Sequence, residues 1–229
     1  MKINSLGKKF VVENFDFETK DSLKKHGPLF PNTIRALICG GSNCGKTNLL
    51  LSLLTHPNGL RFKNVYIYSK SLNQPKYQLL ERIMKGLPQI GYFTYTENVD
   101  VLPPSKVKPF SIMIFDDIPH SNLKNVKEYF SRGRHYSCDS IYLAQSYSAV
   151  FKHLIRDNSN FIVLFKMDDL NLRHVYNDFV NTDFSYEKFK QICHKAWKDK
   201  YSFLVIDKDS DVEHGRYRFG LDRFFSDIV

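Results

Sequence analysis

Residues 40–47, which read Gly-Gly-Ser-Asn-Cys-Gly-Lys-Thr, constrain the fold of this chain more than any other stretch. Two glycines bracket four residues and are followed by Lys and Thr, the spacing of a phosphate-binding loop between a strand and a helix. The apolar run at residues 33–39 predicts the strand, and the leucine-rich run at residues 48–54 predicts the helix. With both flanks present, we favour this loop over a glycine-rich turn that fits the pattern by chance.

The residue types in this loop suit phosphate chemistry. Gly40 and Gly45 allow backbone angles that other residues resist, so the loop can curl with its N–H groups pointing inward. Those amides and the positive end of the following helix would hold phosphates, while Lys46 adds a charge and Thr47 offers a hydroxyl to a bridging Mg²⁺. The stretch predicts a site for a nucleoside triphosphate. The predicted nucleotide-binding residues are Gly40, Gly41, Ser42, Asn43, Cys44, Gly45, Lys46, Thr47 and Asn48.

Length and composition allow one α/β domain. The chain has 229 residues, of which 42% are hydrophobic, enough to bury a full core. No apolar run approaches the roughly 18 residues that a membrane-spanning helix requires. The first residues lack the apolar core of a signal peptide, so we expect a soluble protein, intracellular where it is made. The four cysteines have no metal-ligand spacing, which favours reduced thiols over zinc or disulfide roles.

The net charge of +9 is unevenly distributed. Residues 1–115 carry 16 Lys and Arg against 7 Asp and Glu, whereas residues 116–229 carry 17 of each kind, so the whole excess lies in the first half. A basic half suits a polyanionic partner, and a generally solvated basic surface is the equally weighted alternative.

Strand-like and helix-like segments alternate along the chain, which predicts an α/β fold with a mainly parallel sheet flanked by helices. We expect residues 1–30 to form an N-terminal extension that packs on or near the domain, with a disordered tail as the alternative. Residues 31–229 would form one P-loop domain with C-terminal helices and a last strand, followed by a tail at residues 216–219. Strands are expected at residues 33–39, 64–69, 92–95, 111–117, 140–144, 161–166 and 201–206, and helices at residues 48–54, 75–85, 121–130, 149–155, 170–179 and 185–197.

Two adjacent carboxylates end the apolar strand at residues 111–117. Asp116 is placed to hold Mg²⁺, and Asp117 is placed to polarise the attacking water. Two neighbouring carboxylates are costly to bury without a cation, which favours a metal site. The alternative for Asp117 is a cap on the next helix.

A polar residue, Gln145, ends the strand that follows the acidic strand. In NTPases with an inserted central strand, such a residue reaches the γ-phosphate and the attacking water. The alternative is a strand-end residue that makes only local hydrogen bonds.

Arginines precede the strand that ends at Gln145. Planar guanidinium groups suit transition-state phosphates and can come from a neighbouring subunit, so Arg134 and, second, Arg132 are candidate arginine fingers. A basic loop that touches solvent or DNA is the alternative. A GTPase is disfavoured because no Asp-x-x-Gly follows the acidic strand and no guanine-reading Asn-Lys-x-Asp occurs. A small-molecule kinase would need an arginine-rich lid and an acceptor pocket, and neither stands out.

Together, these motifs resemble those of the genome-packaging ATPases of eukaryotic DNA viruses, in the FtsK–HerA superfamily. This family includes the poxvirus-like enzymes of large DNA viruses and their virophage, adintovirus and Polinton/Maverick relatives. The resemblance covers about residues 30–220 in the order and spacing of four motifs and continues through the C-terminal helices. It is carried by residues 40–50, 112–117, 132–135, 143–147, 165–167, 172–178, 184–197 and 216–218.

The resemblance implies a RecA-like ATPase that forms a homo-oligomeric ring, a pentamer or hexamer, and moves double-stranded DNA into a preformed capsid. Capsid or portal proteins would then be partners, and the setting would be an infected cell, in the nucleus or a cytoplasmic virus factory, or the virion. Many superfamily members place Glu where this chain has Asp117, and the shorter side chain reaches less far. The family also implies ATP and Mg²⁺ as ligands, with catalytic roles for Lys46, Asp116, Asp117, Gln145, Arg134 and Arg132.

Two alternatives stay open at this point: a general DNA translocase or helicase of the same superfamily, and an adaptor that binds ATP without hydrolysing it. DNA that moves through a ring should be held by phosphate contacts, because every sequence must pass. Candidate contacts are Lys106, Lys108, Lys124 and Lys127, although for each lysine taken alone we favour a solvated surface position.

Overall fold

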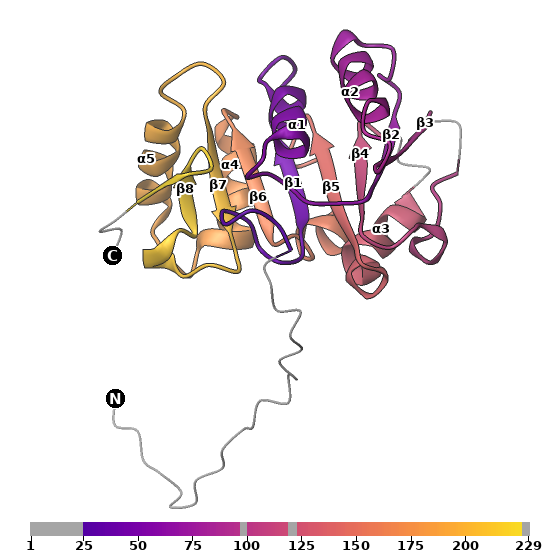
Figure 1. Cartoon of the computed structure of the whole chain (residues 1–229). Coiled ribbons are helices and arrows are strands. Elements are labelled where there is room, and N and C mark those ends of the chain that lie inside the picture. The colour runs from indigo at the N-terminus through magenta and orange to yellow at the C-terminus, as the bar shows by residue number, and fades with distance from the viewer. Residues whose placement is uncertain (1–24, 97–99, 119–122, 226–229) are drawn as a thin grey trace, which may run out of the picture.

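A single nine-stranded sheet organises the computed structural model, which describes residues 25–96, 100–118 and 123–225. Figure 1 shows the strands side by side in the order β3-β2-β4-β5-β1-β6-β7-β8-β9. Short 3-10 or π turns link several elements. The strands are β1 Arg35–Cys39, β2 Asn64–Ser69, β3 Gly91–Tyr95, β4 Ser111–Asp116, β5 Cys138–Ala144, β6 Phe161–Phe165, β7 Phe203–Asp207, β8 Tyr217–Phe219 and β9 Arg223–Phe224. The α-helices are α1 Lys46–Thr55, α2 Pro75–Lys85, α3 Leu123–Arg132, α4 Asp169–Val175 and α5 Tyr186–Ala196.

The first six strands pair in parallel, as the alternation of strands and helices predicts. β5 lies between β1 and the acidic strand β4, so the inserted central strand expected from the sequence is present. This order puts the ends of β1, β5 and β4 next to one another.

The prediction that the strand at residues 201–206 is the last strand was wrong. β7 pairs antiparallel with β6, and β8 and β9 extend the sheet beyond it in antiparallel fashion. Residues 217–219, expected in a tail, form β8, in which Tyr217 and Arg218 are buried. The helix predicted at residues 149–155 is a five-residue π turn, Lys152–Arg156.

Helices cover both faces of the sheet because alternate strand residues point to opposite sides. In β1, Ala36 and Ile38 pack with α1 and α2, whereas Leu37 and Cys39 pack with α3, α4 and α5. The two apolar layers hold the strand ends in fixed positions, which is what a site built at those ends requires.

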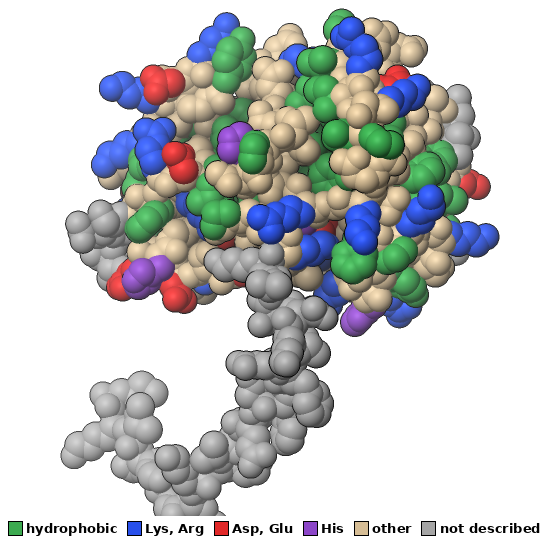
Figure 2. Space-filling view, in the orientation of Figure 1, with side chains coloured by type: hydrophobic (Ala, Val, Ile, Leu, Met, Phe, Trp, Pro, Cys, Tyr) green, Lys and Arg blue, Asp and Glu red, His purple; other side chains and the backbone are tan. Residues whose placement is uncertain are grey.

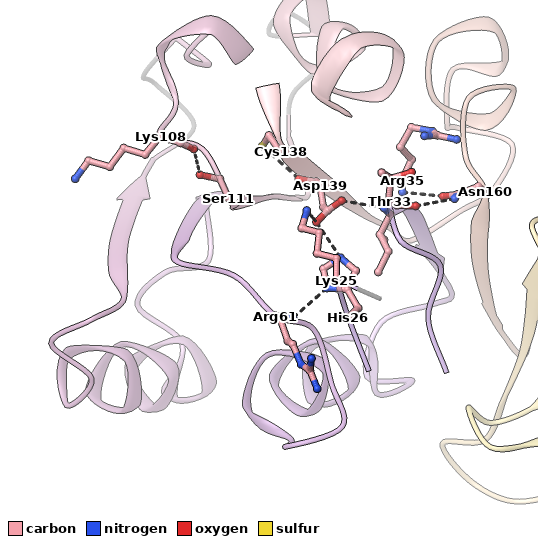
Figure 3. Close-up of polar contacts among 11 residues, drawn as sticks. Lys25, His26, Thr33, Arg35, Arg61, Lys108, Ser111, Cys138, Asp139 and Asn160 are labelled. Atoms are coloured by element: carbon pink, nitrogen blue, oxygen red, sulfur yellow. Dashed lines mark hydrogen bonds and ion pairs between the residues drawn. The ribbon is translucent and has the colours of Figure 1, made fainter. Parts of the chain in front are cut away.

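A buried polar network closes the edge of the sheet where the parallel strands begin (Figure 3). Asp139 of β5 accepts hydrogen bonds from the Ile34 backbone and the Lys25 ammonium and lies 3.0 Å from the His26 ring. Burial alone would raise the pKa of Asp139, but the His26 hydrogen bond and the Lys25 charge outweigh burial and lower it. Residues 25 and 26 of the expected extension therefore pack on the domain, while residues 1–24 lie outside the described part.

Candidate active site

The opposite edge of the sheet gathers most of the predicted site residues. The register pairs Cys39 of β1 with Ala144 of β5, and Leu143 of β5 with Asp116 of β4. The phosphate loop follows Cys39, Gln145 follows Ala144, and the acidic pair begins at Asp116 itself, so the three motifs meet at one edge. A backbone bond from the Gly40 N–H to the Ala144 carbonyl, 3.1 Å long, ties the loop to the end of β5.

The loop conformation depends on its glycines. Gly45 has a φ of 114° and stands immediately before α1, where a side chain would be strained. A Cβ atom on Gly40 would lie 2.5 Å from the Phe165 Cβ and 2.8 Å from the Cys44 Sγ, so only glycine fits there. The first N–H groups of α1 have no partners within the helix, which makes this end suited to an anion.

Lys46 and Thr47 begin α1 at the mouth of this loop. The Lys46 ammonium donates to the Gly40 carbonyl at 2.5 Å and to the Gly41 carbonyl at 2.8 Å. The Thr47 hydroxyl has no hydrogen-bond partner among the described residues, so it remains available to a ligand.

Asp116 is held by two hydroxyl groups. Its Oδ2 accepts from the Tyr77 phenol at 2.6 Å and from the Ser69 hydroxyl at 3.4 Å. Burial raises the pKa of Asp116, and the neighbouring Asp117 charge raises it further. The Tyr77 hydrogen bond and the Lys46 charge lower the pKa, but the net shift is upward. Within the described part of the chain, Oδ1 has no hydrogen-bond partner.

Asp117 and Gln145 contact each other. The Gln145 amide donates to the Asp117 Oδ2 at 3.3 Å, and the Lys70 ammonium pairs with the same oxygen at 2.8 Å. Asp117 has a φ of 55°, which Asp tolerates better than most residues, and its side chain is 38% exposed. This turn directs the second carboxylate away from the buried strand and toward Gln145.

These residues surround one polar hollow of about 150 Å³. A hydroxyl and a carboxylate are the hard oxygen donors that Mg²⁺ prefers, so the Thr47 and Asp116 oxygens fit the predicted ion. Asn48, also predicted to bind nucleotide, lines a different pocket on the other side of Gly45. The predicted residues that line the hollow are Ser42, Asn43, Cys44, Gly45, Lys46, Thr47, Asp116, Asp117 and Gln145.

The structure does not bring the arginine candidates to this hollow. Arg132 ends α3 and Arg134 lies in the turn before β5, both exposed at the edge where β5 begins. Arg134 is close enough to Arg35, the first residue of β1, to lower the pKa of that group, although burial lowers it more. The length of β5, about 20 Å, therefore separates these arginines from the hollow in their own chain.

Contacts from β2 and α2 were missed in the sequence analysis. Lys70 follows the end of β2, Tyr77 lies in the first turns of α2, and Ser71, Gln74 and Lys76 line the hollow. The pairing of Ser69 with Asp116 in adjacent parallel strands brings this region to the acidic pair. Only the parallel arrangement of β2 beside β4 could have indicated these contacts.

We expect Tyr77→Phe to lower the turnover of ATP by about tenfold to a hundredfold, because it removes a hydrogen bond to an ionised group, worth about 1.5–3 kcal/mol. Tyr77 positions Asp116 and lies outside the hollow, so the KM for ATP should change by less than about threefold. Steady-state kinetics measure both values. Equal losses in kcat for Tyr77→Phe and for Tyr92→Phe, a tyrosine beyond the hollow in β3, would contradict a positioning role.

The candidate DNA contacts whose side chains the structure describes lie on the surface. Lys106, Lys108 and Lys127 are exposed, and Lys108 also stacks on the ring of Phe93 at 5.1 Å; the side chain of Lys124 lies outside the described part. Figure 2 shows Lys and Arg side chains spread over the face turned toward the viewer, with hydrophobic side chains between them. No helix within the described ranges has both the length and the apolar composition to cross a membrane.

The sheet order, the loop before α1 and the acidic strand beside the inserted strand give the chain the fold of RecA-like P-loop ATPases. Solved structures with this fold include the genome packaging NTPase B204 from Sulfolobus turreted icosahedral virus 2. Its complex with ATP-gammaS matches with a TM-score of 0.54 and 14% identity over 77% of this chain and 93% of that one. Its complex with sulfate matches with a TM-score of 0.53 and 17% identity over 77% and 92%.

EssC (ATPases 2 and 3) from Geobacillus thermodenitrificans matches with a TM-score of 0.52 and 14% identity over 77% of this chain and 38% of that chain. A genome packaging NTPase is thus among the structural neighbours, in agreement with the sequence resemblance, and at these identities the likeness shows the fold. No family model and no curated protein matches the chain.

Proposed function

We propose that the chain is an ATPase that works as a subunit of a ring and drives double-stranded DNA into a viral capsid. The convergence of the phosphate loop, the acidic pair and Gln145 on one hollow carries this proposal. The sequence resemblance to packaging ATPases and the fold shared with a genome packaging NTPase support the packaging role.

In this proposal each residue has a role that its position permits. The loop amides and Lys46 bind the β- and γ-phosphates, and Lys46 exchanges its bonds to loop carbonyls for phosphate oxygens. Asp117 and Gln145, already in contact, orient a water molecule for attack on the γ-phosphate. A Mg²⁺ ion held by Thr47 and Asp116 would neutralise developing charge on the phosphates.

The ring part of the proposal rests on the position of the arginines. Arg134 cannot reach the hollow of its own chain across the length of β5, yet it is exposed and able to reach a neighbour. A guanidinium offered across a subunit interface can raise hydrolysis by about 10³–10⁵. We therefore assign the trans finger to Arg134, with Arg132 second.

Mixing two inactive variants tests this arrangement. The Arg134→Ala variant keeps an intact hollow, and the Lys46→Ala variant keeps Arg134. In a mixed ring, some interfaces therefore combine an intact hollow from one subunit with Arg134 from its neighbour. We expect each variant alone to hydrolyse ATP at least a hundredfold more slowly than the unmodified chain, and the mixture to recover a measurable fraction of activity. Arg132→Ala, mixed in the same way, is the matched control. We expect this variant to hydrolyse ATP by itself, without the Lys46→Ala protein.

If the Arg134→Ala and Lys46→Ala mixture recovers nothing under conditions where both proteins assemble, Arg134 is not the trans finger. Recovery only with Arg132→Ala would transfer the role to Arg132.

A further inference from the structure

A second pocket lies on the other side of Gly45 from the acidic pair. Its volume is about 670 Å³, within the range of about 300–1,000 Å³ typical of small-molecule sites. We call it the Tyr201 pocket, and its apolar side chains include those of Phe30, Leu49, Leu53, Phe165, Tyr201 and Phe203.

The two cavities adjoin at the phosphate loop. Gly45 lines both of them, and a Cβ on Gly45 would lie 3.3 Å from the Phe165 ring and 3.6 Å from Tyr201. The Tyr201 pocket is built at the ends of β6 and β7, which lie on the side of β1 away from β5 and β4 (Figure 1). A ligand whose phosphates reach toward Asp116 would therefore extend its other end into this pocket.

The pocket offers the chemistry that a planar aromatic group needs. Phe165 is buried in the pocket wall, while Tyr201 is 53% exposed and its ring carries the Lys200 ammonium 4.8 Å from its centroid. Tyr201 has a φ of 68°, an uncommon backbone conformation for a large residue, and this turn places it beside the phosphate loop. Asn48 and Ser52, one turn apart on α1, supply polar groups at the rim.

We propose that the Tyr201 pocket binds the base of the nucleoside triphosphate, with the base stacked against Tyr201. This inference rests on the proposed function, because it needs the phosphates in the adjacent hollow. It assigns the C-terminal segment, through Tyr201 and Phe203, to nucleotide binding. It also explains why Asn48 faces away from the phosphate hollow.

The test compares ATP with inorganic tripolyphosphate, which has the phosphates and lacks the base, by titration calorimetry on the full chain with Mg²⁺. Tyr201→Ala should weaken ATP binding by about fivefold to a hundredfold, the range for loss of one stacked base. It should leave tripolyphosphate binding within about twofold, and Tyr201→Phe should bind ATP like the unmodified chain.

A second variant blocks the pocket without touching the aromatic ring. Ser52→Trp places an indole at the rim and should also weaken ATP binding and spare tripolyphosphate. Thr55→Trp is the matched control, since Thr55 is exposed on the same helix outside the pocket, and its hydroxyl bonds to the carbonyl four residues back, as that of Ser52 does.

The outcomes separate the two claims. If the unmodified chain binds tripolyphosphate, and neither Tyr201→Ala nor Ser52→Trp changes ATP affinity by more than twofold, the base pocket is overturned and the phosphate site stands. If the unmodified chain binds neither ligand, the proposed function fails and this inference fails with it.

Discussion

Replacing Asp116 with asparagine should slow ATP hydrolysis by on the order of a thousandfold and at the same time make the protein more stable at neutral pH. Activity falls because an amide is a poor ligand for Mg²⁺ compared with a carboxylate. Stability rises because burial raises the pKa of Asp116, so its charged form is disfavoured in the folded state. Asparagine keeps an oxygen that can accept the Tyr77 hydrogen bond.

The stability gain has a defined pH dependence. Because the folded pKa of Asp116 is above the unfolded value of 3.8, the folded state holds the proton longer than the unfolded chain. The folded state is therefore destabilised as pH rises from the unfolded pKa through the raised folded pKa of Asp116. The stability advantage of Asp116→Asn is complete above both pKa values and absent below both. Thermal melting with a chelator at several pH values measures it. An Asp116→Asn variant that melts lower than the unmodified chain at pH 8 would contradict the account of Asp116 as a costly buried charge.

Replacing Lys46 with alanine should weaken ATP binding by at least about tenfold and reduce hydrolysis by on the order of a thousandfold. The Lys46 ammonium donates hydrogen bonds to the Gly40 and Gly41 carbonyls of the phosphate loop. We expect phosphate oxygens to bind the ammonium at this position. Lys85→Ala is the matched control, because Lys85 is an exposed lysine paired with Glu81 away from the hollow. Equilibrium binding of ATP compares the two variants. Equal affinity of Lys46→Ala and Lys85→Ala would remove the phosphate role of Lys46.

The sequence predicts the parallel half of the fold well because each step there has a local signal. The loop at residues 40–47 requires a strand before it and a helix after it, and the apolar strands are separated by helices. The antiparallel half has weaker signals. α4 and α5 both lie between β6 and β7 in the sequence. Nothing in the composition of these helices indicates that β7 runs antiparallel to β6. In β8 the charged residue Arg218 is buried, because it forms an ion pair with Asp207. Its charge makes this buried strand look like a polar tail in the sequence.

Some residues of the candidate site could likewise be placed from the sequence, and others could not. Residues at or just after strand ends, such as Asp116 and Gln145, could be placed together because parallel strands end at one edge. Tyr77 and Lys70 could not, because their contacts depend on how α2 and β2 lie against β4. The distance of Arg134 from its own hollow also follows from tertiary structure alone, since in sequence it stands only eleven residues from Gln145.

The most direct test of the central claim is ATP hydrolysis by the full chain with and without double-stranded DNA of several unrelated sequences. We expect turnover that rises with every DNA sequence, declines as salt weakens phosphate contacts, and is absent in Lys46→Ala. Tight ATP binding with no hydrolysis in the presence of any of these DNAs would contradict the account and favour an assembly adaptor.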